Sequence, residues 1–357
     1  MVAPCVVIVG LGRAGAINPD VRDADGANVQ RNHLRAVLAA GMRVRGLVDP
    51  DPDARSAALT AWHDAGGSGD GADAPQLCAA PEEVEIGTAD IVTIASPPAF
   101  HADHVAAAMA LRPDILLIEK PLSADLSGAQ AIADLHAAEG GTIHAVVNFN
   151  RRADPGMADW RELWAGRDPR SVVMRYSDGL MNYASHLVDH ALEWFGVPIQ
   201  VRALPPFTPS ATPEANPSFV LEYDNAPPVH VLGIPDIDYD MFEIDVYFAD
   251  GMVSARNNAV EKSALGRRAD LYYPGYTALT AEEAGSVVRP IGGFTETYRA
   301  LARRLSETDR AAEGVALCTV PEALCGMQIL HAVLRSHGEA GRPIPASEYQ
   351  TAAFAAP

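Results

Sequence analysis

The chain has 357 residues and a formal net charge of −19 at pH 7, with 48% hydrophobic and 20% charged residues. This composition is typical of a soluble globular protein with one large domain or two ordinary ones. The acidic balance argues against a nucleic-acid partner, because a phosphate backbone would repel the protein. The four cysteines lack a C-x-x-C spacing, so we expect reduced thiols rather than a disulfide framework.

The sequence shows no signal for export or membrane insertion. The first ten residues, MVAPCVVIVG, lack a basic segment and a cleavage site and run directly into a glycine-rich turn, as expected for a first strand. No apolar run is long enough to span a bilayer. We therefore expect a cytoplasmic protein without a membrane partner.

Residues 1–150 alternate short apolar runs with helical patterns. The runs predict strands at Val6–Val9, Val44–Val48, Ile91–Ala95, Ile115–Ile118 and Ile143–Val147. Helices are predicted at residues 30–40, 52–64, 100–111 and 125–139. This alternation is typical of a doubly wound α/β domain built on a parallel sheet. The stretch Gly66–Pro75 is predicted to be a surface loop.

Residues 151–357 have a different texture, with alternating apolar and polar positions. Strands are predicted at Ser171–Ser177, Phe219–Tyr223, Val229–Ile234, Phe242–Ala249 and Met252–Asn257. Asp250-Gly251 between the last two is a strong signal for a two-residue hairpin turn. A helix at Ala184–Phe195 and a helical region from Phe294 to His337 complete a second α/β domain, with a large, open and mostly antiparallel sheet.

A glycine-rich turn follows the first predicted strand: Gly10-Leu11-Gly12-Arg13-Ala14-Gly15. This G-x-G-x-x-G pattern, directly after a strand and at the head of an α/β alternation, predicts a dinucleotide-binding turn and a Rossmann domain at residues 1–150. Gly10 permits the tight turn, Gly12 lets the backbone approach a pyrophosphate, and Gly15 allows close helix packing. The next helix would present its N-terminal amides to the phosphates.

The second predicted strand ends in Asp49. A carboxylate here can accept both ribose hydroxyls and would repel a 2′-phosphate, so it favours NAD over NADP. Its spacing from Gly10 is longer than usual, because residues 17–30 (INPDVRDADGANVQ) form a polar insertion. We expect a surface loop there, with an arrangement over the site as the alternative.

The strand at Ile115–Ile118 ends in Glu119-Lys120-Pro121. The chain has two lysines, Lys120 and Lys262, against 25 arginines, so a strand-end lysine indicates a need that arginine does not meet. An ammonium can stabilise developing alkoxide charge and can titrate when buried, which a guanidinium cannot do. We expect Glu119 to position and pair rather than act as a base, and a cis Lys120–Pro121 bond would aim the amine across a nicotinamide. An ordinary surface lysine is the alternative.

Further elements complete an ordered series. Ser96-Pro97-Pro98 with His101, Phe149-Asn150-Arg151-Arg152, and Ser185-His186-Leu187-Val188-Asp189 follow one another along the chain. With the glycine turn, Asp49 and Glu119-Lys120-Pro121, this order resembles the Gfo/Idh/MocA oxidoreductases, such as glucose–fructose oxidoreductase and inositol dehydrogenase. The resemblance covers most of the chain.

The resemblance implies a nicotinamide cofactor and hydride transfer at a secondary alcohol or ketone of a sugar or polyol. Cofactor contacts would come from the glycine turn, Asp49, Ser96, Pro97, His101 and Glu119. Lys120 would hydrogen-bond the reacting oxygen, and His186 would serve as acid/base, which suits a neutral imidazole near its pKa. Residues 151–357 would bind the substrate and form a homodimer or homotetramer through the open sheet.

Substrate contacts would come from Lys120, Arg152, Asn182, Tyr183 and His186. Many relatives carry aspartate where this chain has Asn182, four residues before His186; asparagine can orient the ring without adding charge, so we include it among the catalytic residues. Arg151 and Arg152 suit an anionic substrate group or structural ion pairs equally.

Two further points concern the second domain. His186 and His190 have a spacing that can hold a metal, but no third ligand accompanies them, so we expect no metal; a structural role is the other alternative. Tyr176, Tyr183 and residues 236–240 are expected to shape the substrate pocket.

Three functions remain open. The leading one is an NAD-dependent dehydrogenase or reductase acting on a sugar, sugar nucleotide or cyclitol. A second is a glycosidase that oxidises a sugar carbon transiently while NAD is retained. A third is a non-catalytic NAD(P)- or sugar-binding regulator, which Asn182 mildly favours and the retention of Lys120 and His186 disfavours.

Overall fold

The computed structural model describes residues 3–22, 28–69, 74–85, 89–205, 216–281, 287–288, 292–306 and 317–350. The chain divides into two units, Met1–Asp154 with Gly292–Leu324, and Pro155–Ile291 with Cys325–Pro357. Residues 292–324, which the sequence placed in the second domain, therefore belong to the first unit. Sequence patterns identify helices but not the sheet on which the helices pack. The sequence therefore gave no indication that residues 292–324 return to the first unit.

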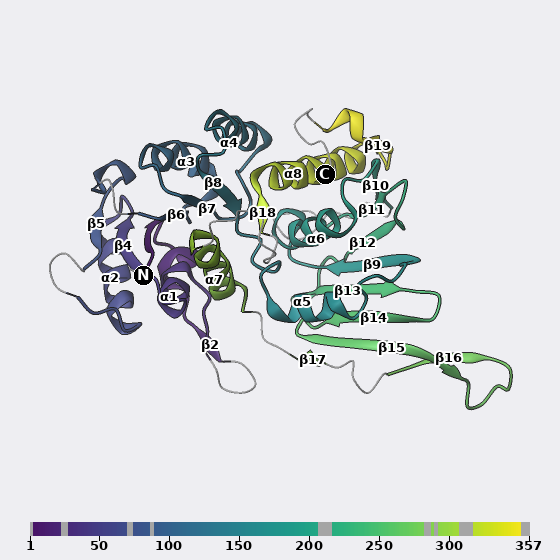
Figure 1. The fold of residues 1–357 in the computed structure, drawn as a ribbon. Coiled ribbons are helices and arrows are strands. Elements are labelled where there is room, and N and C mark those ends of the chain that lie inside the picture. Colours follow the sequence, from purple (N-terminus) through teal and green to yellow (C-terminus); the bar gives the residue numbers. More distant parts are fainter. Residues whose placement is uncertain are drawn as a thin grey trace. The chain divides into compact units, whose positions relative to one another are not determined.

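The first unit contains a seven-stranded sheet (Figure 1). Neighbouring strands are parallel, except that β18 runs antiparallel to β8. The order is β18 (Cys318–Thr319), β8 (His144–Val147), β7 (Ile115–Ile118), β6 (Ile91–Ile94), β1 (Cys5–Val9), β4 (Arg43–Val48) and β5 (Gln76–Cys78). The central strands β1, β6 and β7 are buried at every position, as expected for a sheet covered on both faces. The predicted parallel sheet is confirmed.

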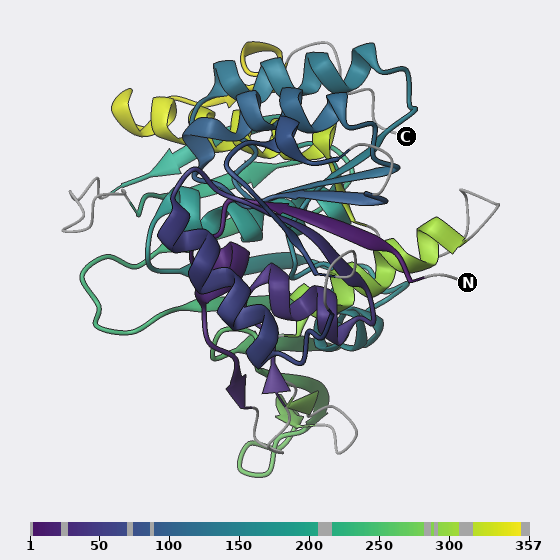
Figure 2. The same ribbon diagram turned by 90° about the vertical axis from the view of Figure 1, so that its left-hand side faces the viewer.

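Helices cover both faces of this sheet (Figure 2). One face carries α3 (His101–Ala110) and α4 (Leu126–Ala138), and the other carries α1, α2 and α7. These last three helices span His33–Ala39, Pro52–Asp64 and Gly293–Ser306. α7 packs beside α1, although some 250 residues separate the two helices in the chain. The side chains of Asn32, Asp51 and Asp125 cap α1, α2 and α4 by accepting backbone N–H groups.

The insertion after the glycine turn begins a hairpin, β2 (Val21–Arg22) with β3 (Asn28–Val29); residues 23–27 lie outside the described residues. Its two ends are tied together, because Asn32 Nδ2 donates to the Asn18 carbonyl at 2.6 Å and Asn18 Nδ2 to the Arg31 carbonyl at 3.4 Å. As a result, α1 begins at residue 33 rather than 30.

The second unit contains a ten-stranded sheet (Figure 1). The order is β16 (Thr277–Ala281), β15 (Glu261–Ala269), β14 (Gly251–Arg256), β13 (Phe242–Tyr247), β9 (Ser171–Tyr176), β12 (Val229–Gly233), β11 (Ser218–Glu222), β10 (Gln200–Leu204) and β19 (Ile344–Pro345), with β17 (Val287–Val288) paired to β15. Only the β9–β12 pair is parallel among the pairings described. The predicted mostly antiparallel sheet is confirmed.

The hairpin between β13 and β14 differs from the prediction by one residue. Phe248 N donates to the Gly251 carbonyl at 2.8 Å, so the two turn residues are Ala249 and Asp250. Gly251 lies in β14 instead, where a Cβ would come within 2.3 Å of the Leu265 carbonyl oxygen. The glycine therefore serves close strand packing rather than the turn.

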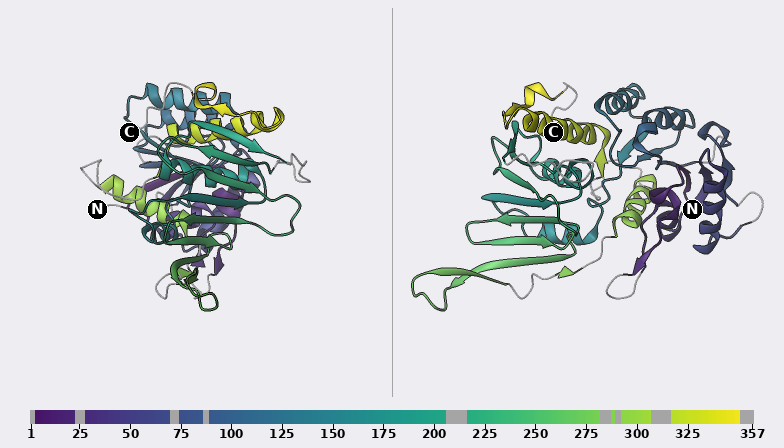
Figure 3. Two further views of the ribbon diagram at one scale, coloured as in Figure 1. Left: turned by 90° about the vertical axis from the view of Figure 1, so that its right-hand side faces the viewer. Right: turned by 180° about the vertical axis from the view of Figure 1, so that it is seen from behind.

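One face of this sheet packs against α5 (Pro155–Glu162), α6 (Ser185–Phe195) and the part of α8 (Val320–Gly338) that follows Leu324. Its core holds the fully buried rings of Trp160, Tyr176, Phe219 and Phe242. The hairpin of β15 and β16 forms one edge of the sheet and is visible from behind in Figure 3.

Candidate functional site

The glycine turn shows three distinct reasons for its glycines. Gly10 has φ +89°, and a Cβ there would lie 2.3 Å from Ser96 N, so the turn touches the loop after β6. A Cβ on Gly15 would lie 2.0 Å from the Gly10 carbonyl oxygen. Gly12, in contrast, faces open space, with nothing within 4 Å of the position that a Cβ would take. A cradle of this kind fits a pyrophosphate that approaches the backbone at Gly12.

The helix that follows the glycine turn is shorter than the helix that the sequence predicts there. Arg13–Ile17 forms a five-residue π-helix and ends at Asn18, where the insertion departs. The helix dipole predicted for the phosphates is thus reduced to one turn, and amides of the glycine turn become the main available donors. Arg13 is exposed beside them, and Ala14 is half-buried.

Asp49 is tied to the glycine turn at the end of β4. Its Oδ2 accepts Leu11 N at 2.9 Å, and its Oδ1 accepts Asp51 N at 3.0 Å. Leu11 is fully buried as a whole residue, and its N–H already donates to Asp49. A carboxylate has about four acceptor positions, so these bonds orient Asp49 and still leave capacity for ribose hydroxyls.

His101 joins two loops at this edge of the sheet. The ring is fully buried, with Nε2 2.8 Å from the Ser96 carbonyl oxygen and Nδ1 3.2 Å from that of Leu122. Such a ring cannot touch a cofactor directly, and we correct its predicted role to holding the loops after β6 and β7. His104, which the sequence did not indicate, lies 2.8 Å from Ser96 Oγ. Burial lowers the pKa of His104, and His101 lowers it further, which favours the neutral ring. Pro97 is exposed beside Ser96.

Glu119 and Lys120 follow β7, and the Lys120–Pro121 bond is cis, as predicted. The Glu119 side chain is only 12% exposed. Its Oε1 accepts Asn148 Nδ2 at 2.6 Å and lies 2.9 Å from His33 Nε2, while its Oε2 accepts Lys120 N at 3.0 Å. Burial alone would raise the pKa of Glu119, but the hydrogen bonds from His33 and Asn148 and the charge of Lys120 hold it below its usual value.

The polar contacts of Glu119 continue into the core. His33 Nδ1 lies 2.9 Å from the Tyr298 hydroxyl, which lies 2.8 Å from Thr93 Oγ1. Thr93, His33 and Tyr298 are all fully buried. The sequence indicated none of them, since His33 and Tyr298 are 265 residues apart. The available signal was a polar residue within an apolar strand, Thr93, and polar residues on helices, His33 and Tyr298.

Arg152 is held in an ion pair within the first unit. Its side chain is 1% exposed, with Nη1 3.2 Å from Glu322 Oε1. Glu322 is itself fixed, because its Oε2 accepts Thr319 N at 2.7 Å at the start of α8. Of the two interpretations of this arginine, this geometry favours the structural ion pair, and substrate binding by Arg152 stays a prediction.

The predicted residues of the second unit lie on one helical segment, a π-helix at Leu180–Ala184 that continues as α6. Asn182 is exposed, and its Nδ2 donates to Asp178 Oδ2 at 3.1 Å. His186 is half-buried, with its ring edge toward Phe242 at a centroid distance of 6.4 Å. Tyr183 is half-buried against the core.

His190 has a structural environment. It is 1% exposed, its ring stacks on Trp194 at 4.8 Å, and its Nδ1 lies 3.2 Å from Glu193 Oε2. Within the described ranges, no three His, Cys, Asp or Glu side chains are grouped to hold a metal ion. The i, i+4 spacing of the two histidines therefore gains no further ligand from the fold.

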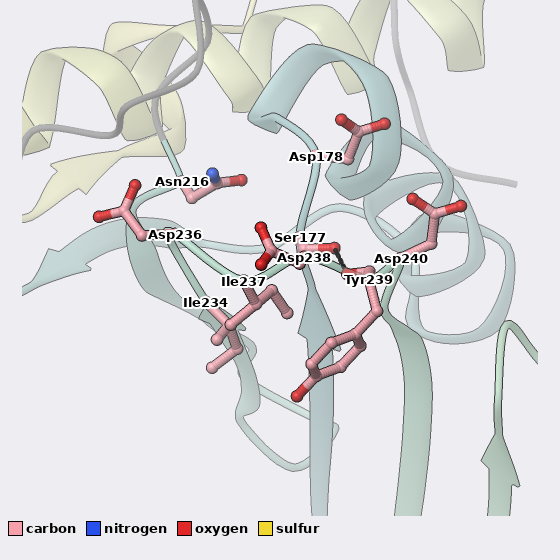
Figure 4. A pocket seen from close by; sticks show the side chains of 9 residues that line it. All are labelled: Ser177, Asp178, Asn216, Ile234, Asp236, Ile237, Asp238, Tyr239 and Asp240. Atoms are coloured by element: carbon pink, nitrogen blue, oxygen red, sulfur yellow. Dashed lines mark hydrogen bonds between the residues drawn. The ribbon is translucent and has the colours of Figure 1, made fainter.

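A cavity of about 450 Å³ lies in the second unit, beyond the ends of β9 and β12 (Figure 4). Its lining residues are Ser177, Asp178, Asn216, Ile234, Asp236, Ile237, Asp238, Tyr239 and Asp240. Ser177 fixes one wall, since its Oγ donates to the Tyr239 carbonyl at 3.2 Å and accepts Met241 N at 2.9 Å. The expected contribution of residues 236–240 to a pocket agrees with this lining, whereas Tyr176 is a core residue whose hydroxyl donates to the Pro217 carbonyl.

Residues 5–147 match the family described as the oxidoreductase family (GFO_IDH_MocA) with an NAD-binding Rossmann fold. No curated protein matches the chain. Among the helices that the structure describes, none combines the length and apolar character needed to cross a membrane.

Solved structures share the fold over nearly the whole chain. UDP-N-acetylglucosamine 3-dehydrogenase GnnA from Acidithiobacillus ferrooxidans is 15% identical with a TM-score of 0.68, covering 98% of this chain and 100% of its own. The WlbA dehydrogenase from Bordetella pertussis, in complex with NADH and UDP-GlcNAcA, is 16% identical with a TM-score of 0.66, covering 96% and 98%. The super-repressor mutant of Gal80p from Saccharomyces cerevisiae is 15% identical with a TM-score of 0.71, covering 99% and 100%. At these identities the likeness concerns the fold alone.

Proposed function

We propose that this chain, whose residues 5–147 match the Gfo/Idh/MocA oxidoreductase family, is an NAD-dependent dehydrogenase or reductase that acts on a CH–OH group of a sugar or cyclitol. NAD, when bound, supplies the hydride acceptor. The chain supplies the residues that orient the cofactor and substrate and move the hydroxyl proton.

The observation that carries this proposal is the edge of the sheet where the strands end. The glycine turn follows β1, Asp49 follows β4, Ser96 follows β6 and Lys120 follows β7, which are four adjacent strands. The chain order reverses between β6 and β1, and ligands of doubly wound sheets bind at such a switch point. Contact between Gly10 and Ser96 places the loops of the two central strands together there.

Lys120 and His186 have complementary chemical roles in the proposal. Oxidation of a carbinol requires removal of its hydroxyl proton, and an ammonium next to the oxygen stabilises the alkoxide that develops. We assign that oxygen contact to Lys120 and the proton transfer to His186. Asp178 accepts the Asn182 amide just before the π-helix at Leu180–Ala184, and we propose that its carboxylate takes the place of the charge that relatives carry at position 182.

The cavity in the second unit narrows the substrate class. Four of its nine lining residues are aspartates, and they would repel a phosphate or carboxylate. We propose that the cavity receives a neutral sugar or cyclitol, because carboxylates are good acceptors for hydroxyl groups. This substrate class differs from that of GnnA, which is named as a UDP-N-acetylglucosamine 3-dehydrogenase, and from the UDP-GlcNAcA in the WlbA complex.

The test of the proposal is Lys120→Met, compared with Lys262→Arg as the control at the other lysine. NAD affinity is measured by calorimetry, and turnover is measured by NADH absorbance with a panel of sugars, cyclitols and sugar nucleotides. We expect Lys120→Met to retain NAD and to lose about 10²- to 10⁴-fold in kcat. Unchanged turnover in Lys120→Met would overturn the proposal.

The same panel separates the alternative functions. A glycosidase would release sugar without net NADH formation and would retain NAD through turnover. A regulator would bind NAD and give no turnover with any compound. Fast turnover of sugar nucleotides and none of neutral sugars would contradict the substrate class that the acidic cavity suggests.

A further inference from the structure

A continuous line of buried polar side chains ends at Lys120. It comprises Thr93, Tyr298, His33 and Glu119, linked by distances of 2.8, 2.9 and 2.9 Å. We propose that Tyr298 and His33 are positioning residues, which keep Glu119 ionised behind Lys120 and thereby keep Lys120 cationic at the strand tip. The catalytic importance of this arrangement rests on the function proposed for Lys120; the arrangement itself does not.

The hydrogen bonds of this line are consistent with donation in one direction, from Thr93 toward Glu119. A neutral His33 that accepts the Tyr298 hydroxyl at Nδ1 must carry its proton on Nε2. Nε2–H then donates to Glu119 Oε1, 2.9 Å away. Glu119, which can only accept, therefore requires this tautomer, and Tyr298 supports it by donating to Nδ1 while Thr93 donates to the Tyr298 oxygen. The opposite tautomer would place a bare nitrogen against a carboxylate, which costs energy inside a protein.

The ring of His33 is also held in place by packing. Phe294 contacts it edge-on at a centroid distance of 5.1 Å, and Tyr298 does so at 5.8 Å. Both aromatic residues come from α7, the segment that returns to the first unit late in the chain. α7 thus supplies the hydroxyl that supports the tautomer and the rings that set the orientation.

Both carboxylate oxygens of Glu119 accept hydrogen bonds. Asn148 donates to Oε1 at 2.6 Å, and the Lys120 backbone amide donates to Oε2 at 3.0 Å. Donors on both oxygens stabilise the charged form, and the pKa of Glu119 is lowered despite its burial. Because Lys120 contributes to that lowering, Glu119 must favour the ammonium form of Lys120 by the same interaction energy.

The lysine content of the chain allows a direct measurement. Lysine labelled with ¹³C at Cε gives two side-chain signals, from Lys120 and Lys262, and Lys262→Arg assigns them. The Lys120 signal is titrated in the wild type, Glu119→Gln and Tyr298→Phe, with bound NAD as a check of the fold. Tyr176→Phe is the matched control, because Tyr176 is also fully buried and donates to a carbonyl in the second unit.

We expect the apparent pKa of Lys120 to fall by about one unit in Glu119→Gln, by less in Tyr298→Phe, and not at all in Tyr176→Phe. ¹⁵N-labelled histidine, assigned with His33→Gln, should show a proton on His33 Nε2 in the wild type. A Lys120 titration that is identical in the wild type and Tyr298→Phe, or a His33 Nε2 without a proton, would overturn the proposal.

The two proposals fail separately. If Lys120→Met keeps full turnover, the proposed function falls, while the titration of Lys120 still tests its positioning. If Lys120 is required but Tyr298→Phe leaves both its titration and the pH profile of kcat unchanged, the positioning role falls alone. Support for both would appear as a shifted pH profile of kcat in Tyr298→Phe with an unchanged KM for NAD.

Discussion

Two buried carboxylates, one in each unit, are neutralised in opposite ways. Asp245 in the second unit is fully buried, and Glu119 in the first is 12% exposed. Asp245 contacts the guanidinium groups of Arg175 and Arg256, both at 2.7 Å, and accepts Ser254 Oγ at 2.8 Å. Glu119 contacts an imidazole, an amide and a backbone N–H, and the charge of Lys120 helps to lower its pKa.

The origin of the partners differs as well. Arg175, Ser254 and Arg256 lie on β9 and β14, the two strands that flank Asp245 in β13. The contacts of Glu119 come from elements up to 86 residues away in the chain. Arginines do not titrate near neutral pH, so the cluster around Asp245 joins neighbouring strands of the sheet by fixed charges. The cluster around Glu119 contains groups that can exchange protons, as a functional site requires.

The largest expected effect comes from breaking the arginine cluster. Asp245→Ala removes the buried carboxylate and leaves Arg175 and Arg256 with Glu243, 3.7 and 2.6 Å away, so the free energy of unfolding should fall by about 3 kcal/mol. Both arginines are partly exposed, at 24% and 38%, so water limits the loss. Urea unfolding followed by tryptophan fluorescence measures it. Glu243→Gln, at the rim of the cluster, should cost less than about 1 kcal/mol, and a similar loss in both variants would contradict the assignment of Asp245 as the centre.

The second effect concerns the acid dependence of stability. Because the pKa of Glu119 is lowered in the folded state, its carboxylate adds stability above the unfolded pKa, and that stability is lost as pH falls through the folded pKa. Glu119→Gln should therefore be less stable than the wild type by about 2 kcal/mol near neutral pH. The difference should shrink below about pH 4. Urea midpoints that differ equally at pH 7 and at acid pH would show that Glu119 is not held ionised.

The comparison also shows what the sequence can predict. The parallel strands were located correctly, because strands buried on both faces, such as β1 and β7, are apolar throughout. The glycine turn and Lys120 were found because their residue types are needed at fixed places relative to a strand. Both motifs consist of residues that are consecutive in the sequence, so they can be recognised without knowledge of the fold.

The rest depends on contacts between distant parts of the chain. Tyr298 belongs to a helix whose pattern gives no indication of the sheet on which it packs, so neither its bond to His33 nor the extent of the first unit could be inferred. Arg152 was ambiguous for the same reason, since Glu322 is 170 residues away. The hairpin turn shifted by one residue because a neighbouring strand, rather than the turn, requires Gly251.

A third prediction separates fold from ligand binding within the glycine turn. Gly12 has φ −69° and open space at its Cβ position, so Gly12→Ala should leave stability unchanged. The added methyl would occupy the space proposed for the pyrophosphate, and NAD affinity should fall about tenfold, or 1.4 kcal/mol. Gly338→Ala, which also meets nothing within 4 Å, is the control for both measurements. Unaltered NAD affinity in Gly12→Ala, measured by calorimetry, would remove the turn from the cofactor site.

The smallest effect tests why asparagine occupies position 182. Its amide donates to Asp178 at 3.1 Å, so Asn182→Asp would bring two exposed carboxylates together at the start of the π-helix. An exposed charge pair contributes about 0.2–1 kcal/mol, and the repulsion should be of that size. Thermal unfolding should therefore show a small loss at neutral pH that disappears at acid pH and in high salt, where the charges are neutralised or screened. Asp178→Asn combined with Asn182→Asp restores one carboxylate and one amide and should recover the wild-type stability. If the double variant stays as unstable as Asn182→Asp alone, charge repulsion is not the cause, and Asp178 does not replace the aspartate found in relatives.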